Sequence, residues 1–252
     1  MWDDIALKKV DLDFFNGIED NSAFYFTFDE NHNIVPVKEP DYHLFESSIY
    51  PFVIYHDELR FLNQYYYETA QTIKKYIGSV VSNFQRYAAM DESEFRTWDF
   101  TKYEMMMSCQ GEMFLCERIV WHSSSHLVTL LYSFLERALK KLWTDMFLEH
   151  SKSAVSSKSN VKLYVFIERI FSVPIDEFGQ KYPDIYQRLE TVRKYRNQVI
   201  HGQFRTNEAS DEYEEINELP PFRLIELIEL ISSVLDLVEW EYISLTSTKQ
   251  KD

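Results

Sequence analysis

The feature that most constrains the fold is an apolar stripe at helical spacing between residues 127 and 146. Its members recur every three or four residues, as on one face of an α-helix. They are Leu127, Leu130, Leu131, Phe134, Leu135, Ala138, Leu142 and Met146. Only five glycines and seven prolines occur in 252 residues, which favours long helices over many tight turns. We therefore expect a mainly α fold in which this helix packs against other helices.

Further helical segments are expected along the chain. They cover residues 57–90, 91–122, 161–173 and 183–201, and a last helix starts at Pro220–Pro221. The serines at 123–125 predict the start of the helix with the long stripe. The stripe of the last helix comprises Ile225, Ile228, Ile231, Val234, Leu235 and Val238.

The first half of the chain differs from the second. Residues 22–37 alternate aromatic and polar side chains around the turn-rich DENHN, which predicts a β-hairpin. We expect residues 1–120 to form an N-terminal helical extension that carries this hairpin. Residues 121–247 are expected to form a helical bundle, and residues 248–252 a frayed tail.

Several classes of protein are disfavoured by composition. No stretch approaches the roughly 20 apolar residues of a membrane span. The N-terminus lacks the pattern of a secretory signal, so a cytoplasmic protein without a membrane partner is expected. Cys109 and Cys116 are seven residues apart, unlike a CxxC redox pair or a zinc knuckle, and predict two buried or half-buried free thiols.

Charge is distributed unevenly. The net charge is −15, so non-specific attraction to nucleic acid is not expected. Residues 181–205 nevertheless contain six Arg or Lys against two acidic residues, and residues 206–219 contain six acidic residues and no basic one. Any contact with RNA must therefore use this local basic patch.

Arg196 occupies an unusual position in the predicted helix 183–201. Ile185, Leu189, Val192 and Val199 define its core-facing stripe, and Arg196 falls in the middle of that stripe. A guanidinium is costly to desolvate unless it is paired. Two alternatives remain open here: a buried carboxylate neutralises Arg196, or a phosphate does so in a cleft. The candidate carboxylates on other helices are Glu117, Glu136 and Glu168.

A second polar feature lies beside it. Arg193, Asn197 and His201 follow one another at four-residue spacing and form a ridge. On a continuous helix His201 lies about 140° from Arg196. A site that needs both residues requires either that the helix ends near Gly202 or that two copies of the chain contribute to it.

The segment Arg196-Asn197-Gln198-Val199-Ile200-His201 resembles the R-x4–6-H signature of HEPN domains, including the polar residue after the arginine. The context is similar too, because the signature ends a late helix and one helix follows. The resemblance covers only the C-terminal half. It implies a bundle of four to five helices, a homodimer, and a metal-independent endoribonuclease without a cofactor.

The resemblance also implies roles for individual residues. Arg196 would hold the scissile phosphate, His201 would act as general acid or base, and Asn197 would orient the reacting groups. Cleavage would leave a 2′,3′-cyclic phosphate. By charge alone we expect Arg193, Lys194 and Arg205 to bind substrate.

Such domains commonly serve as toxins or in anti-phage defence, so the resemblance implies an antitoxin or regulatory protein as a partner besides RNA. Some HEPN toxins carry a tyrosine two residues after the histidine, where this chain has Gln203. A pairing with a nucleotidyltransferase that modifies this tyrosine is therefore in doubt.

Two alternative functions remain. The first is a non-catalytic helical protein whose HEPN-like half dimerises or binds a partner, with Arg196 paired internally. The second is a zinc hydrolase that uses His122 and His126, which have the i, i+4 spacing of a zinc-binding helix. No glutamate follows His122, and no third ligand is evident, so no metal site is predicted.

Overall fold

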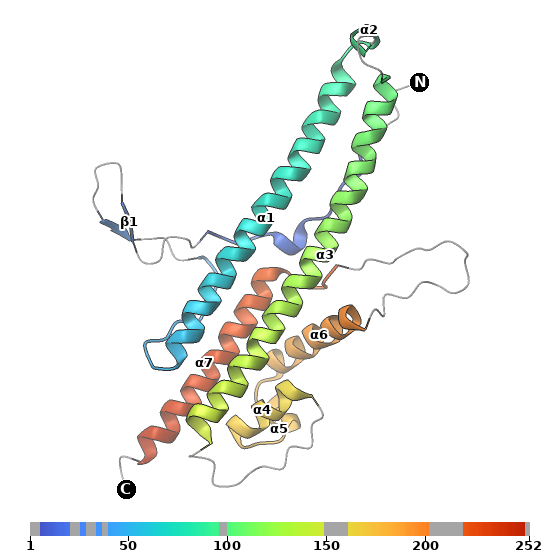
Figure 1. Cartoon of the computed structure of the whole chain (residues 1–252). Helices are drawn as coiled ribbons and strands as arrows, with labels where there is room; N and C mark the ends of the chain where they lie inside the picture. Colours follow the sequence, from blue (N-terminus) through green and yellow to red (C-terminus); the bar gives the residue numbers. More distant parts are fainter. Residues whose placement is uncertain are drawn as a thin grey trace, which may run out of the picture.

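The computed structural model describes residues 6–20, 26–28, 34–36, 40–95, 100–148, 161–201 and 219–249. The fold is mainly helical (Figure 1). Its elements are η1 (Asp13–Phe15), β1 (Phe26–Phe28), β2 (Ile34–Pro36), α1 (Phe52–Ala89), α2 (Glu92–Phe95), α3 (Lys102–Leu142), η2 (Trp143–Phe147), α4 (Lys162–Phe171), α5 (Ile175–Lys181), α6 (Pro183–Ile200) and α7 (Leu224–Lys249).

The two longest helices dominate the molecule. α1 has 38 residues and α3 has 41, and they run antiparallel, joined at one end by α2 (Figure 1). At 1.5 Å per residue each is about 60 Å long. Thr101 and Glu104 form a capping box that starts α3. The pair extends beyond α6 and α7 at the end that carries α2.

The helix start predicted at Ser123–Ser125 is wrong, because these serines lie inside α3. Ser124 donates its hydroxyl hydrogen to the backbone oxygen of Trp121 at 2.9 Å, and both Ser124 and Ser125 are buried. Serine can satisfy its hydroxyl within a helix in this way, so a serine run without proline or glycine does not interrupt one.

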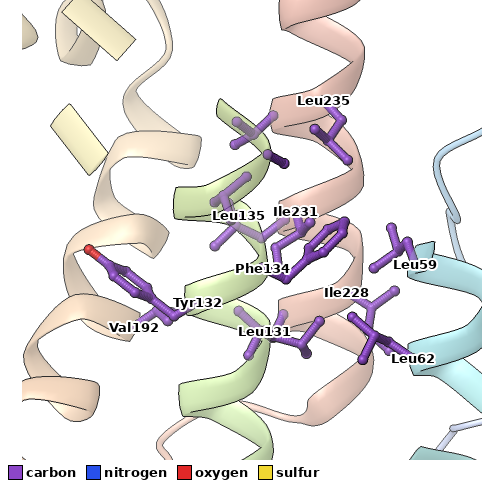
Figure 2. Packing of buried hydrophobic residues seen from close by; sticks show 14 of the residues in the cluster. Leu59, Leu62, Leu131, Tyr132, Phe134, Leu135, Val192, Ile228, Ile231 and Leu235 are labelled. Atoms are coloured by element: carbon purple, nitrogen blue, oxygen red, sulfur yellow. The ribbon is translucent and has the colours of Figure 1, made fainter. Parts of the chain in front are cut away.

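The bundle core surrounds the middle of α3. Leu131, Phe134 and Leu135 of α3 gather with Ile228 and Ile231 of α7 and with Leu59 and Leu62 of α1 (Figure 2). All eight members of the predicted 127–146 stripe belong to this cluster or pack against it, which confirms the stripe. Deleting such side chains typically costs about 2–5 kcal/mol each.

Residues of the first half share this core. Phe14, Phe15, Phe45 and Phe52 are buried in the same cluster as the α3 and α7 side chains. The domain division predicted between residues 120 and 121 falls within α3.

A second, smaller cluster lies toward α2 and comprises Val80, Tyr87, Phe95, Met106, Cys109, Met113 and Cys116. The two cysteines are buried free thiols, as predicted, and burial raises their pKa.

The remaining elements follow the expected order with local differences. α4 lies within the predicted segment 161–173 and ends at Phe171, and its C-cap residue, Ser172, has a left-handed φ of 54°. α5 was not expected, and α7 begins at Leu224 rather than at the Pro220–Pro221 pair. β1 and β2 pair antiparallel, with Thr27 opposite Val35, inside the segment 22–37.

Among the described helices, none is both long enough and apolar enough to cross a membrane.

Candidate functional site

Helix α6 carries the basic stretch and packs on α3. Its core-facing residues are Leu189, Val192 and Tyr195, all buried. The hydroxyls of Tyr195 and Ser125 lie 3.1 Å apart in the buried interface. The sequence predicted Arg196 in the middle of the core-facing stripe, but the buried residue at this point of the helix is Tyr195. Tyr195 buries its ring, and its hydroxyl pairs with that of Ser125. Arg196 lies at the edge of the stripe and is partly exposed.

The Arg196 guanidinium rests between an aromatic ring and an amide. Its central carbon lies 5.4 Å from the centroid of the Tyr132 ring on α3. Its Nη1 donates a hydrogen bond to the Asn197 side-chain oxygen at 3.1 Å, while its buried Nε has no hydrogen-bond partner. Within the described residues Arg196 forms no ion pair. Among the described residues the contacts of this guanidinium are thus with neutral groups, an arrangement that suits an anionic ligand.

Tyr132 provides a rigid support beneath this guanidinium. Its side chain is 2 % exposed and projects from α3 toward α6 (Figure 2). Burial raises the pKa of Tyr132, and the carboxylate of Glu136 adds to this effect, whereas Arg196 and Arg193 oppose it. The phenol therefore stays neutral at physiological pH and presents an uncharged π-face to Arg196.

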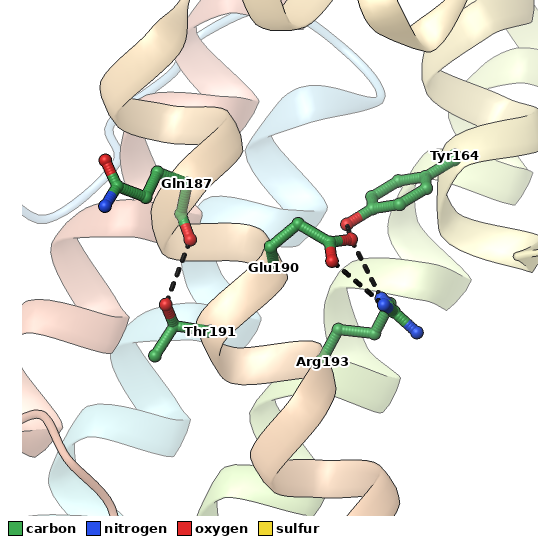
Figure 3. A network of polar contacts seen from close by, with 5 residues as sticks. All are labelled: Tyr164, Gln187, Glu190, Thr191 and Arg193. Carbon is green, nitrogen blue, oxygen red and sulfur yellow. Dashed lines mark hydrogen bonds and ion pairs between the residues drawn. The ribbon is translucent and has the colours of Figure 1, made fainter.

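Arg193 has a different environment. Its Nε and Nη2 each donate to a carboxylate oxygen of Glu190 at 2.9 Å (Figure 3). The Tyr164 hydroxyl on α4 donates to the same carboxylate. The Arg193 guanidinium and the other hydrogen bonds hold the pKa of Glu190 below its usual range. The charge of Arg193, predicted to bind substrate, is already compensated within a network that joins α6 to α4.

His201 terminates α6. The helix ends at Ile200, and the backbone N–H of His201 donates to the Asn197 carbonyl at 3.0 Å. The His201 side chain is exposed and Asn197 is partly exposed. The helix therefore ends close to the predicted position, while Gly202 and Arg205 lie outside the described residues. Lys194 is exposed.

The geometry of one chain separates Arg196 from His201. The five-residue step between them corresponds to about 140° around the axis of α6. Of the predicted catalytic residues, the structure brings Arg196 and Asn197 into direct contact. α6 ends at Ile200, between the two residues, and no hydrogen bond joins Arg196 to His201 within the described part of the chain.

The three carboxylates considered as partners of Arg196 have other surroundings. Glu117 forms an ion pair with Lys8 at 2.5 Å. Glu168 is buried and accepts the backbone N–H of Ile175 at 3.1 Å. Glu136 lies one turn from Tyr132 on α3 and lines a groove toward α4.

Three residues of this region were missed by the sequence reasoning. Glu190 could have been found, because it lies three residues before Arg193 on the same helix. Tyr132 and Tyr164 could not, because they come from α3 and α4 and meet α6 only through the tertiary fold.

The two histidines considered as zinc ligands under the alternative function lie elsewhere on the surface. His122 and His126 are both exposed on α3. No group of three or more His, Cys, Asp or Glu side chains suited to a metal ion occurs in the part of the chain that the structure describes.

Searches of protein-family models, of curated proteins and of solved structures return no match to this chain, so the resemblance to HEPN domains depends on the Arg196–His201 segment and the order of the helices.

Proposed function

We propose that the protein is a metal-independent endoribonuclease of the HEPN type, acting as a homodimer with a composite site. The observation that carries this proposal is the state of Arg196, which forms no ion pair among the described residues. It contacts Tyr132 and Asn197 instead. A partly exposed guanidinium without a carboxylate is suited to a phosphate oxygen.

The reaction needs only groups of the protein and of the RNA. The ribose 2′-oxygen attacks the adjacent phosphorus, and the bond from phosphorus to the 5′-oxygen breaks. The imidazole of His201 removes the 2′-hydroxyl proton or protonates the leaving 5′-oxygen, and water exchanges the other proton. Arg196 stabilises the charge on the non-bridging oxygens. The products are a 2′,3′-cyclic phosphate and a 5′-hydroxyl.

The first test is cleavage of single-stranded RNA in EDTA. We expect cleavage by the full chain and a loss of about 100-fold or more in His201→Ala, with cut ends that carry a cyclic phosphate. His126→Ala is the matched control, because His126 is another exposed histidine. Equal cleavage by His201→Ala and the parent protein would remove the proposal.

A mixed-dimer experiment tests the composite site. If Arg196 of one protomer works with the imidazole of its partner, a dimer of Arg196→Ala and His201→Ala chains keeps one complete site. We therefore expect co-expressed variants to recover cleavage that neither shows alone. Failure of recovery in a purified mixed dimer would contradict a site shared in this way.

A toxin or anti-phage role, restrained by an antitoxin or regulatory protein, extends the same proposal. The expected phenotype is growth arrest on expression of the parent chain, and normal growth with Arg196→Ala at equal protein level. Arrest by both chains would disconnect toxicity from the proposed nuclease.

A non-catalytic interaction protein is the second candidate. It is favoured by exposed large side chains on the long helix pair, such as Phe61, which is 64 % exposed, and Phe114, which is 54 % exposed. Under this alternative Phe61→Ser abolishes association with a partner, while RNA stays intact with every variant.

A further inference from the structure

A groove between α3 and α4 lies next to the candidate site. Its volume is ≈ 500 Å³, which lies within the usual size range of small-ligand pockets. The lining side chains include Glu136, Arg137 and Lys140 from α3 and Lys162, Val165 and Phe166 from α4. The groove thus has an apolar wall, Val165 and Phe166, beneath a basic rim.

The basic rim stands out in a chain of net charge −15. Lys140 and Lys162 are exposed, and their side chains form no ion pair within the described residues. Arg137 is paired with Glu58 of α1, so its charge is partly compensated. Two ammonium groups without an ion-pair partner among the described residues therefore line the groove together with Glu136.

Phe166 offers an aromatic surface within this rim. It is partly exposed, and the guanidinium carbon of Arg169 lies 5.8 Å from its ring centroid. Aromatic rings beside cations are the usual stacking platforms for unpaired bases, and lysines bind the phosphates between them. An apolar wall alone would not favour a polyanion, whereas the positive charges of the lysines do.

The groove and the candidate site both adjoin α3. Tyr132, Glu136 and Lys140 are spaced by four residues and form one ridge of the helix. Tyr132 supports Arg196 at one end of this ridge, and Lys140 lines the groove at the other. The rise between them is about 12 Å, a distance that a few nucleotides of single strand can span.

We propose that this groove binds a single-stranded stretch of the RNA next to the scissile phosphate, with a base stacked on Phe166 and phosphates held by Lys140 and Lys162. This deepens the proposed function and rests on it. It predicts that substrates need an unpaired flank, because a base in a duplex cannot reach the Phe166 ring.

The test is a binding titration of the full chain with a fluorescent single-stranded 2′-O-methyl RNA of about 12 nucleotides, which lacks the attacking hydroxyl. We expect Lys140→Glu with Lys162→Glu to weaken binding about tenfold or more at low salt. We also expect the slope of log affinity against log salt concentration to become less steep by about 0.7 per lysine lost. The control is Lys9→Glu with Lys75→Glu, the same charge change at two exposed lysines elsewhere.

A second variant separates stacking from charge. Phe166→Leu keeps an apolar wall and should weaken binding about fivefold or more, with little change in salt dependence. Thermal unfolding confirms that the variant is folded. Unchanged affinity in the folded groove variants would overturn the proposal, as would failure of the parent chain to bind the RNA. Binding of a polyglutamate peptide in place of RNA, through the same lysines, would assign the groove to an acidic protein segment and also overturn it.

The outcomes distinguish this inference from the nuclease proposal. Groove-dependent binding without any RNA cleavage removes the nuclease and keeps the groove. Cleavage that depends on Arg196, with normal binding and cleavage in the groove variants, keeps the nuclease and removes the groove.

Discussion

Two arginines one turn apart on α6 have opposite environments. Arg193 makes a two-pronged contact with Glu190, which also accepts the Tyr164 hydroxyl (Figure 3). Arg196 meets the neutral groups of Tyr132 and Asn197. The difference shows that a basic stretch is not a uniform binding surface. Arg193 joins α6 to α4 through Glu190, whereas Arg196 forms no ion pair among the described residues and is the residue that we propose binds a phosphate.

The sharpest test of this contrast is Arg196→Ala. Because the guanidinium is proposed to stabilise charge that develops on the phosphate, we expect RNA cleavage to fall about 100-fold or more. The free energy of unfolding should change by only about 1 kcal/mol, the scale of a cation–π contact. Cleavage gels and denaturant titrations measure the two effects.

Arg86→Ala serves as the control, since Arg86 is exposed near the α2 end of α1 and should leave cleavage unchanged. A large loss of stability in Arg196→Ala, with cleavage retained, would reverse the roles assigned to the two arginines.

The converse test is Glu190→Gln. The neutral amide leaves Arg193 without its counter-charge in a half-buried site, so we expect a loss of about 2 kcal/mol in the free energy of unfolding. Glu68→Gln on the exposed face of α1 is the control. A Glu190→Gln protein as stable as its parent would show that the network in Figure 3 contributes little.

The pH dependence of stability sharpens the same comparison. The pKa of Glu190 is lowered from its ordinary value of 4.5, chiefly by the Arg193 hydrogen bonds. A carboxyl group whose pKa is lower in the folded than in the unfolded protein stabilises the fold fully above its unfolded pKa. This stabilisation is lost as the pH falls through its folded pKa. The stability difference between the parent and Glu190→Gln should therefore shrink below pH 4.5. A difference that grows on acidification would contradict this sign.

The smallest expected effect comes from changing Tyr132, whose ring contacts the Arg196 guanidinium. Tyr132→Phe keeps the ring and should cleave RNA within about twofold of the parent, whereas Tyr132→Leu should lose about fivefold, on the scale of one cation–π contact. The comparison is made on variants whose unfolding transitions are cooperative. Equal rates in the two variants would mean that the ring does not position the guanidinium.

Much of the helical content could be predicted because periodicity is a local signal. The 127–146 stripe packs as expected, and α6 ends at Ile200, close to the predicted end. The serines at 123–125 misled the prediction, since the α3 backbone accepts the Ser124 hydroxyl and Tyr195 pairs with that of Ser125. Tyr195 was overlooked as a core residue because its hydroxyl finds Ser125, a partner 70 residues away.

The sequence by itself determined that long amphipathic helices form and that a basic stretch ends one of them. Those properties depend on residue spacing along the chain, which fixes the face on which each side chain lies. Only the tertiary structure decided which arginine is neutralised, because that depends on Tyr132 and Tyr164 arriving from α3 and α4. Electrostatic compensation acts over a few ångströms in space, and distance along the chain does not set it.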